Sequence, residues 1–335
     1  IRQLRPDVVI VDILLQGRLK APALIEQIRT SETPVPVIVM TVPQQPVSVD
    51  PKAGIVGVLS MPFSGFDLVN RVQQVHQDAN EAAKRSGAGC YAVFAPKGGV
   101  GKTTIAFNLA CALGAAGRRT ILIDGSLQFG DLRALLKVPL DAPSIVDLPT
   151  DRITEADLAD VVWRDPSGID FLLAPPRVEQ AEMITTRDID KTLSLLRRLY
   201  DVVVVDVPTY LSEQSLAFLD AADIVIEIVT FDSTTIHNTI LMAETFRAIG
   251  YPATKIRYLV NRADSAGGLT LEELARALGR VPEYRVVSDG RLVVAANNEG
   301  VPFVTSAPDA QISRDIAAVA ADLLAGTREP VGARR

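Results

Sequence analysis

Residues 97–104 read Lys97-Gly98-Gly99-Val100-Gly101-Lys102-Thr103-Thr104. They follow an apolar run at 90–95, typical of a buried strand, and precede apolar residues at helical spacing over 105–113. A glycine-rich turn between a strand and a helix lets backbone N–H groups point at phosphate oxygens, and the helix dipole adds to the attraction. The stretch therefore predicts a phosphate-binding loop for a nucleoside triphosphate.

The residue types in this loop predict their roles. Lys102 is expected to reach the β- and γ-phosphates, and the Thr103 hydroxyl to ligate Mg²⁺. Pro96 departs from the common GxxxxGK[ST] pattern at the first glycine position. The alternative, a glycine-rich turn that binds nothing, is disfavoured because strand, loop, Lys-Thr and helix follow in the required order. The other loop residues predicted to line the nucleotide are Gly98, Gly99, Val100, Gly101 and Thr104.

Composition limits the possible classes of protein. A chain of 335 residues with 48% hydrophobic and 22% charged residues is typical of a globular protein with two domains. The net charge of −6 disfavours a nucleic-acid partner. No apolar run approaches the roughly 20 residues of a membrane span, and no signal peptide is visible, so we expect a cytoplasmic protein. Because Ile1 begins in the middle of a pattern, we expect a piece of a longer chain.

Changes in composition predict the domain boundaries. Residues 1–76 alternate expected strands (7–13, 35–41, 54–60) with expected helices (21–29, 65–76), and 77–87 are polar, as in a linker. A second domain is expected over 88–328, followed by a short tail at 329–335. Its expected strands are 90–95, 120–123, 169–173, 201–205, 224–229, 256–260 and 284–287, and its expected helices include 155–163, 233–249 and 274–278. This rhythm predicts an α/β fold with a mostly parallel, doubly wound sheet.

Three polar residues end predicted strands of the second domain. Asp124 follows an apolar strand, Asp206 follows four valines, and Asn261 ends the strand at 256–260. An open α/β sheet binds its ligand at the carboxyl ends of its strands. Asp206 is placed to hold Mg²⁺ through water. A strand-terminal aspartate alone is about as often a turn residue, so this interpretation depends on the loop.

Together these motifs resemble the MinD/ParA group of deviant P-loop ATPases. The resemblance implies ATP and Mg²⁺ as ligands and a homodimer with ATP between its subunits, in which Lys97 crosses to the partner's phosphates. It also implies that Asp124 supports the first switch, that Asp206 is the Walker B carboxylate, and that Asn261 meets the adenine. Residues 288–302 resemble the family's late nucleotide-edge segment. Lys97, Asp124 and Asp206 are thus the expected catalytic residues.

One position departs from the family pattern. The switch normally reads Asp-x-Asp, but the second position here is Ser126. A serine cannot replace a carboxylate in orienting water, so we expect slow or absent hydrolysis. Asp131 is an alternative carboxylate, although a solvated loop residue is the simpler interpretation.

Residues 1–75 resemble the back half of a response-regulator receiver domain. Residues 6–12 match the strand that ends in the phosphorylated aspartate, 39–41 the strand that ends in Ser or Thr, and 61–63 the Lys-Pro-Phe turn. Met61 replaces the lysine that stabilises an acyl phosphate. A degenerate docking or dimerisation module is therefore favoured over phosphorylation of Asp12.

A receiver-like domain fused to such an ATPase resembles the TadZ/CpaE proteins of Flp (tad) pilus assembly. The resemblance implies an ATP-dependent organiser of a pilus or type II-like secretion apparatus, located at a cell pole or peripherally on the membrane, with assembly proteins as partners. Two alternatives stay open: a hydrolysing ParA/MinD-type positioning ATPase that cycles on DNA or membrane, and a signalling module.

Several other residues are given structural roles. Cys90 and Cys111 are expected in the core, and His237 on an exposed helix face. An apolar stripe near the C-terminus lacks a lysine-rich opposite face, which favours a core helix over a lipid-binding one. That stripe consists of Ile312, Ile316, Val319, Leu323 and Leu324.

Overall fold

A computed structural model describes residues 6, 8–15, 19–31, 35–45, 47–50, 53–72, 75, 89–149, 153–265 and 269–326. The chain divides into two compact units, Ile1–Ser86 and Gly87–Arg335. The expected linker at 77–87 and the expected tail at 329–335 lie outside the described residues.

The first unit contains a three-stranded parallel sheet of order β1-β2-β3. Its core is formed where Ile25 and Ile28 of the helix pack against Val11 and Val39 of the strands. Residues 65–72 are also helical. The expected strands are therefore present but slightly shorter, and the helix expected over 65–76 lies partly outside the described residues. Their bounds are β1 Val9–Asp12, α1 Ala21–Arg29, β2 Val37–Thr41 and β3 Ile55–Ser60.

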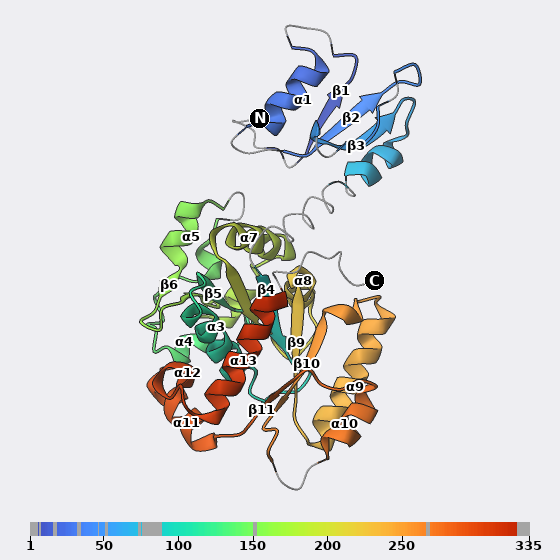
Figure 1. The fold of residues 1–335 in the computed structure, drawn as a ribbon. Coiled ribbons are helices and arrows are strands. Elements are labelled where there is room, and N and C mark those ends of the chain that lie inside the picture. The colour runs from blue at the N-terminus through green and yellow to red at the C-terminus, as the bar shows by residue number, and fades with distance from the viewer. Residues whose placement is uncertain are drawn as a thin grey trace. The chain divides into compact units, whose positions relative to one another are not determined.

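In the second unit, strands and helices alternate over most of the described residues (Figure 1). Its strands are β4 Gly89–Phe94, β5 Thr120–Asp124, β6 Trp163–Arg164, β7 Asp170–Leu172, β8 Val202–Asp206, β9 Ile224–Val229, β10 Ile256–Asn261 and β11 Tyr284–Val286. Its helices are α3 Lys102–Ala115, α4 Leu132–Leu135, α5 Glu155–Val161, α6 Val178–Ala181, α7 Thr186–Leu199, α8 Glu213–Ala221, α9 Ser233–Ala248, α10 Leu271–Leu278, α11 Gly290–Glu299, α12 Phe303–Ser306 and α13 Gln311–Gly326, with short 3₁₀ turns at Ile145–Asp147 and Ala253–Lys255.

These strands form one eight-stranded sheet of order β11-β10-β9-β4-β8-β5-β7-β6. All neighbours are parallel except β6, which pairs antiparallel with β7. The expected mostly parallel, doubly wound α/β fold is confirmed. Two helix boundaries were wrong. The helix expected over 274–278 already begins at Leu271, and the helix expected over 155–163 ends at Val161, with Trp163 beginning β6. Val162 is extended, in keeping with the strand preference of consecutive β-branched and aromatic residues.

Alternation within the strands explains why both sheet faces are covered. Along β8, Val203 and Val205 belong to the core under α7, α8 and α9, whereas Val202 and Val204 belong to the core under α3 and α13. A strand buried on both faces must be apolar at every position. The run of four valines therefore fixes β8 at the centre of the sheet.

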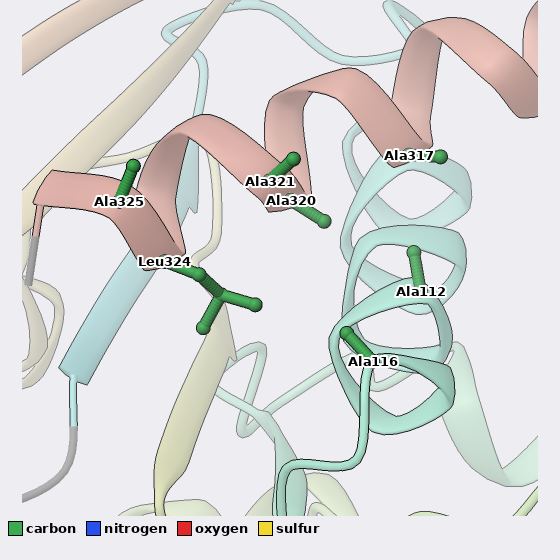
Figure 2. Close-up of a pocket in the computed structure, with 7 residues that line it drawn as sticks. All are labelled: Ala112, Ala116, Ala317, Ala320, Ala321, Leu324 and Ala325. Atoms are coloured by element: carbon green, nitrogen blue, oxygen red, sulfur yellow. The ribbon is translucent and has the colours of Figure 1, made fainter.

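The C-terminal helix α13 packs against α3 (Figure 2). Ile312, Ile316 and Val319 are buried in the shared core, so the expected core helix is confirmed. Alanines of both helices and Leu324 line a small pocket between them, and none of these side chains is polar. Among the described residues, no helix has the length and hydropathy that a membrane span requires.

Glu227 is an acidic residue that the sequence analysis did not single out. It lies fully buried in β9, on the same face as Val225 and Val229. Burial raises its pKa to about 8, despite the neighbouring Thr239 hydroxyl. The carboxyl group is therefore mainly protonated in the folded protein at neutral pH.

This raised pKa predicts a loss of stability at alkaline pH. From its ordinary pKa of 4.5 up to about 8, Glu227 binds a proton in the folded but not in the unfolded state, so stability falls as pH rises. We expect a loss of about 2–4 kcal/mol between pH 6 and pH 9, measured by urea unfolding. Glu227→Gln should flatten that slope, whereas Glu244→Gln, at an exposed position of α9, should not. Equal slopes in wild type and Glu227→Gln would contradict this account.

Candidate nucleotide-binding site

The loop between β4 and α3 has the backbone that a phosphate-binding loop requires. Gly99 and Gly101 have φ of +76° and +96°, in the left-handed region that favours glycine. A Cβ at Gly101 would also stand 2.6 Å from the Asn261 amide nitrogen. Glycine is therefore needed at position 101 for conformation and for space, and it is followed at once by the first turn of α3.

Thr103 and Asp206 meet where α3 begins and β8 ends. The Thr103 hydroxyl donates to Asp206 Oδ2 at 2.6 Å. Asp206 is only 3% exposed, and its Oδ1 has no hydrogen-bond partner among the described residues. Burial raises the pKa of Asp206 to about 6, although the hydrogen bond from Thr103 and the charge of Lys102 act in the opposite direction. A buried carboxylate oxygen without a partner, beside a hydroxyl, fits the oxygen ligands that Mg²⁺ prefers.

Asp124 has a different role from Asp206. Its carboxylate accepts the backbone N–H groups of Ser126 and Leu132, at 3.2 and 3.1 Å. A Cβ at Gly130 would stand 2.5 Å from Asp124 Oδ2, so the loop packs directly on this carboxylate. Burial, followed by the charge of Asp206, raises the pKa of Asp124 to about 8. Asp124 thus fixes the loop over residues 125–132, as a switch-supporting residue would.

That loop carries Ser126 and Asp131. The Ser126 hydroxyl donates to the Phe129 carbonyl at 2.9 Å, so it is used within the loop. Asp131 is exposed and makes no capping hydrogen bond to α4. Its charge nevertheless contributes to raising the pKa of both Asp124 and Asp206. Asp131 is therefore solvated, as expected, but close enough to influence the buried carboxylates.

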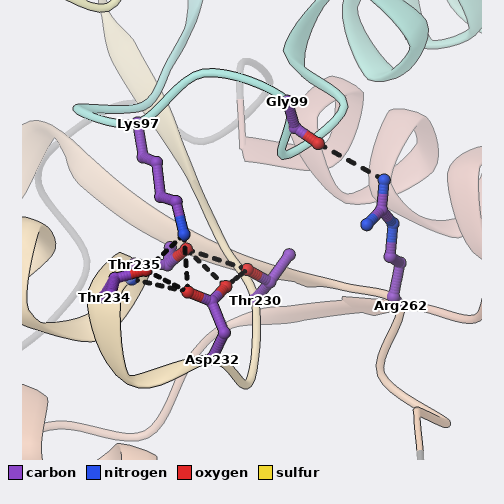
Figure 3. A network of polar contacts seen from close by, with 7 residues as sticks. All are labelled: Lys97, Gly99, Thr230, Asp232, Thr234, Thr235 and Arg262. Carbon is purple, nitrogen blue, oxygen red and sulfur yellow. Dashed lines mark hydrogen bonds and ion pairs between the residues drawn. The ribbon is translucent and has the colours of Figure 1, made fainter.

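Lys97 points to the start of α9 (Figure 3). Its ammonium group lies 2.7 Å from Asp232 Oδ1 and donates to the Thr234 hydroxyl. Partial burial raises the pKa of Asp232, but the hydrogen bonds from Lys97 and three threonines outweigh this and hold that pKa well below its ordinary value. Asp232 is therefore a carboxylate at any ordinary pH, and it holds Lys97 within its own chain.

The end of β10 contacts the glycine-rich loop from the other side. The Asn261 amide donates to the Val100 carbonyl at 2.8 Å. Arg262 Nη2 donates to the Gly99 carbonyl at 3.3 Å (Figure 3). Arg262 was given no role in the sequence analysis. Its φ of +55° is unusual for a residue other than glycine.

The late segment also reaches the loop. Asn297 of α11 donates to the Thr104 hydroxyl at 3.3 Å. Of the residues set aside, His237 is exposed on α9, and Cys90 and Cys111 are buried in the core, as expected. Across the described ranges, no three His, Cys, Asp or Glu side chains gather into a metal site.

This fold and site define the class of P-loop nucleotide-binding proteins. A buried strand leads through a glycine-rich loop into a helix, and the aspartate of the neighbouring strand bonds the loop's threonine. Residues 91–303 match the model of the CobQ/CobB/MinD/ParA nucleotide binding domain. The chain belongs to this family, and the expected resemblance to the MinD/ParA group is confirmed at that level.

Individual relatives are distant. An uncharacterized ATP-binding protein of Methanocaldococcus jannaschii is 24% identical over 238 residues, covering 71% of this chain and 88% of that protein. A ParA family ATPase from Chlorobium tepidum has a TM-score of 0.65 at 23% identity and covers 69% of this chain and 98% of its own. MinD from Pyrococcus horikoshii, complexed with Mg-ADP, has a TM-score of 0.62 at 21% identity, covering 73% and 100%. These solved structures share the fold.

Proposed function

We propose that this protein binds ATP with Mg²⁺ and uses it to join two copies face to face, with weak or absent hydrolysis. The observation that carries the proposal is the Thr103–Asp206 pair, which leaves one buried carboxylate oxygen unused at the start of α3. The family match and the Mg-ADP bound to MinD from Pyrococcus horikoshii support the choice of ligand.

We propose that different residues of the loop bind different parts of the nucleotide. Thr103 would ligate Mg²⁺ directly and Asp206 through water, and the ion would neutralise phosphate charge. Lys102 would contact the β- and γ-phosphates, and backbone N–H groups of residues 98–104 would surround the remaining phosphate oxygens. Asn261, which bonds the Val100 carbonyl, is proposed to meet the adenine.

The placement of Lys97 supports the proposed dimer. Its side chain is about one third exposed, and its partner Asp232 about one half. An exposed ion pair contributes little to stability, about 0–1 kcal/mol, so the lysine can exchange partners. A phosphate group offers it more negative charge than one carboxylate does. We propose that the phosphates of a second subunit are that partner.

Hydrolysis is expected to be slow because Ser126 offers no carboxylate. Its hydroxyl donates to the Phe129 carbonyl, and the neutral oxygen that remains accepts from water more weakly than a carboxylate would. Loss of one water-positioning group reduces rates by about 10²–10⁴-fold.

Ser126→Asp should therefore accelerate hydrolysis by at least about tenfold, since it restores the second switch carboxylate. Phosphate release under single-turnover conditions measures the rate. Ser126→Asn is the matched control, because asparagine has the size of aspartate but not its charge. Hydrolysis by this variant should stay slow. Rapid hydrolysis by the wild type that Lys102→Ala abolishes would overturn the prediction of weak turnover.

The proposed biological role is an organiser of Flp (tad) pilus assembly or of a type II-like secretion apparatus. It rests on the resemblance to TadZ/CpaE proteins, with assembly proteins as partners and a position at a cell pole or peripherally on the membrane. Residues 1–76 are proposed as a degenerate receiver-like docking module. There the Asp12 carboxylate accepts the Leu14 N–H at 2.9 Å, and Met61 directly follows β3.

The second candidate is a hydrolysing positioning ATPase. MinD, a septum site-determining protein, and a ParA family ATPase are among the structural neighbours, which favours this reading. It requires turnover to reset the dimer, so the hydrolysis measurement separates the two candidates.

A further inference from the structure

The sheet order indicates on which side of the loop a nucleotide base would lie. Asp206 and Asp124 end β8 and β5, on one side of β4, whereas β9, β10 and β11 lie on the other. Lys102, Thr103 and Asp206 mark the terminal phosphates and Mg²⁺. The base, at the opposite end of the nucleotide, is therefore expected toward β10 and β11. This inference rests on the proposed nucleotide binding.

Two segments at that side contact the loop directly. Asn261 and Arg262, at the end of β10, bond the Val100 and Gly99 carbonyls. Asn297, on the helix that follows β11, bonds Thr104. The end of β10 and helix α11 thus flank the start of α3, and the loops that follow β10 and precede α11 lie on the side where a base would extend from the phosphates.

Asp264 joins these two loops. Its Oδ1 accepts both the backbone N–H of Ser288, at 2.6 Å, and the Ser288 hydroxyl, at 2.8 Å. These hydrogen bonds hold the pKa of Asp264 below its ordinary value, so the carboxylate is ionised and accepts hydrogen bonds only. Two donors occupy Oδ1, whereas Oδ2 has no partner among the residues that the structure describes. The side chain is exposed, yet its orientation is fixed.

A carboxylate that faces the base can distinguish adenine from guanine by the group bonded to carbon 6 of the purine ring. Adenine carries an amino group there, which donates a hydrogen bond, whereas guanine carries a carbonyl oxygen, which only accepts. Oδ2 can accept from the amino group but is repelled by the carbonyl. We propose that Asp264, oriented by Ser288, is the base-selecting residue and that it accepts a hydrogen bond from the 6-amino group of adenine through Oδ2.

Titration calorimetry with Mg²⁺ and three nucleotides tests this assignment. The nucleotides are ATP, GTP and purine riboside triphosphate, which lacks the 6-amino group. Wild type should bind ATP at least about tenfold more tightly than either of the others, because a hydrogen bond to a charged group is lost with each. Asp264→Asn should reduce the preference for ATP over GTP by at least about tenfold, since an amide can donate to the six-carbonyl. Its affinity for purine riboside triphosphate should stay within about twofold of wild type.

Two further variants separate recognition from general effects. Ser288→Ala should weaken ATP preference without changing the affinity for purine riboside triphosphate. Asp160→Asn, on the exposed face of α5, removes the same charge elsewhere and should change nothing. If ATP binds but Asp264→Asn keeps its full preference, or if wild type prefers GTP, this inference is wrong while nucleotide binding stands. If no triphosphate binds, both this inference and the proposed function fail.

Discussion

Replacing Lys102 by alanine should weaken the binding of Mg²⁺-ATP by about 100-fold. Lys102 begins α3 directly before Thr103, whose hydroxyl donates to the buried Asp206, and the charge of Lys102 lowers the pKa of that carboxyl. Charge-assisted hydrogen bonds to phosphate would be lost, each of about 1.5–3 kcal/mol. Without Lys102, the phosphates would also face the ionised Asp206 with less compensating positive charge. Titration calorimetry at neutral pH measures the change.

A matched control is available for this variant. Lys137→Ala removes the charge of an exposed lysine in the same unit and should leave the affinity unchanged. Unfolding by urea shows whether each variant keeps its fold. An unchanged affinity in folded Lys102→Ala would mean that the loop does not bind phosphate in the way proposed.

Replacing Lys97 by alanine should abolish ATP-dependent dimerisation and leave ATP affinity within about threefold of wild type. Lys97 is directed away from its own loop toward Asp232 and Thr234, so it is not needed to hold a nucleotide in its own subunit. Its loss would instead remove a cation from each of the two shared phosphate sites. Sedimentation analysis at saturating ATP should show a dimer dissociation constant raised by at least about 100-fold.

Asp232 provides the complementary variant. Asp232→Asn removes the carboxylate that holds Lys97 but keeps an oxygen that can accept from Thr235 at the start of α9. It should strengthen the ATP-dependent dimer, because Lys97 no longer has to break its salt bridge with Asp232 before it contacts the partner's phosphate. Two results would contradict the proposal that Lys97 leaves Asp232 to bind the partner's phosphates. One is loss of dimerisation in a folded Asp232→Asn variant, and the other is an intact dimer in Lys97→Ala.

Local patterns predicted most of the second unit, because burial on both faces forces long apolar runs such as Val202–Asp206, with its four valines. Turn glycines and the Lys-Thr pair likewise located the phosphate-binding loop. Short elements were predicted less well: β6 has only two residues, and it pairs antiparallel with β7, the next strand in the chain. A two-residue strand leaves no periodicity to detect.

Contacts between distant residues could not be predicted. Lys97 and Asp232 are separated by 135 positions, and Asp264 and Ser288 by 24. No sequence spacing predicts either contact, because each contact depends on how the ends of different strands align in the sheet. Glu227 was missed for a related reason: a glutamate inside an apolar strand pattern gives no sign of whether it is paired, exposed or buried neutral.

The mass of the wild-type protein in solution, measured by light scattering after gel filtration, tests the central claim most directly. Without nucleotide and with ADP, the account predicts the mass of one chain. With Mg²⁺-ATP it predicts the mass of two, and Lys97→Ala is predicted to stay at one chain under the same conditions. A mass that neither ATP nor Lys97→Ala alters would contradict the ATP-gated dimer.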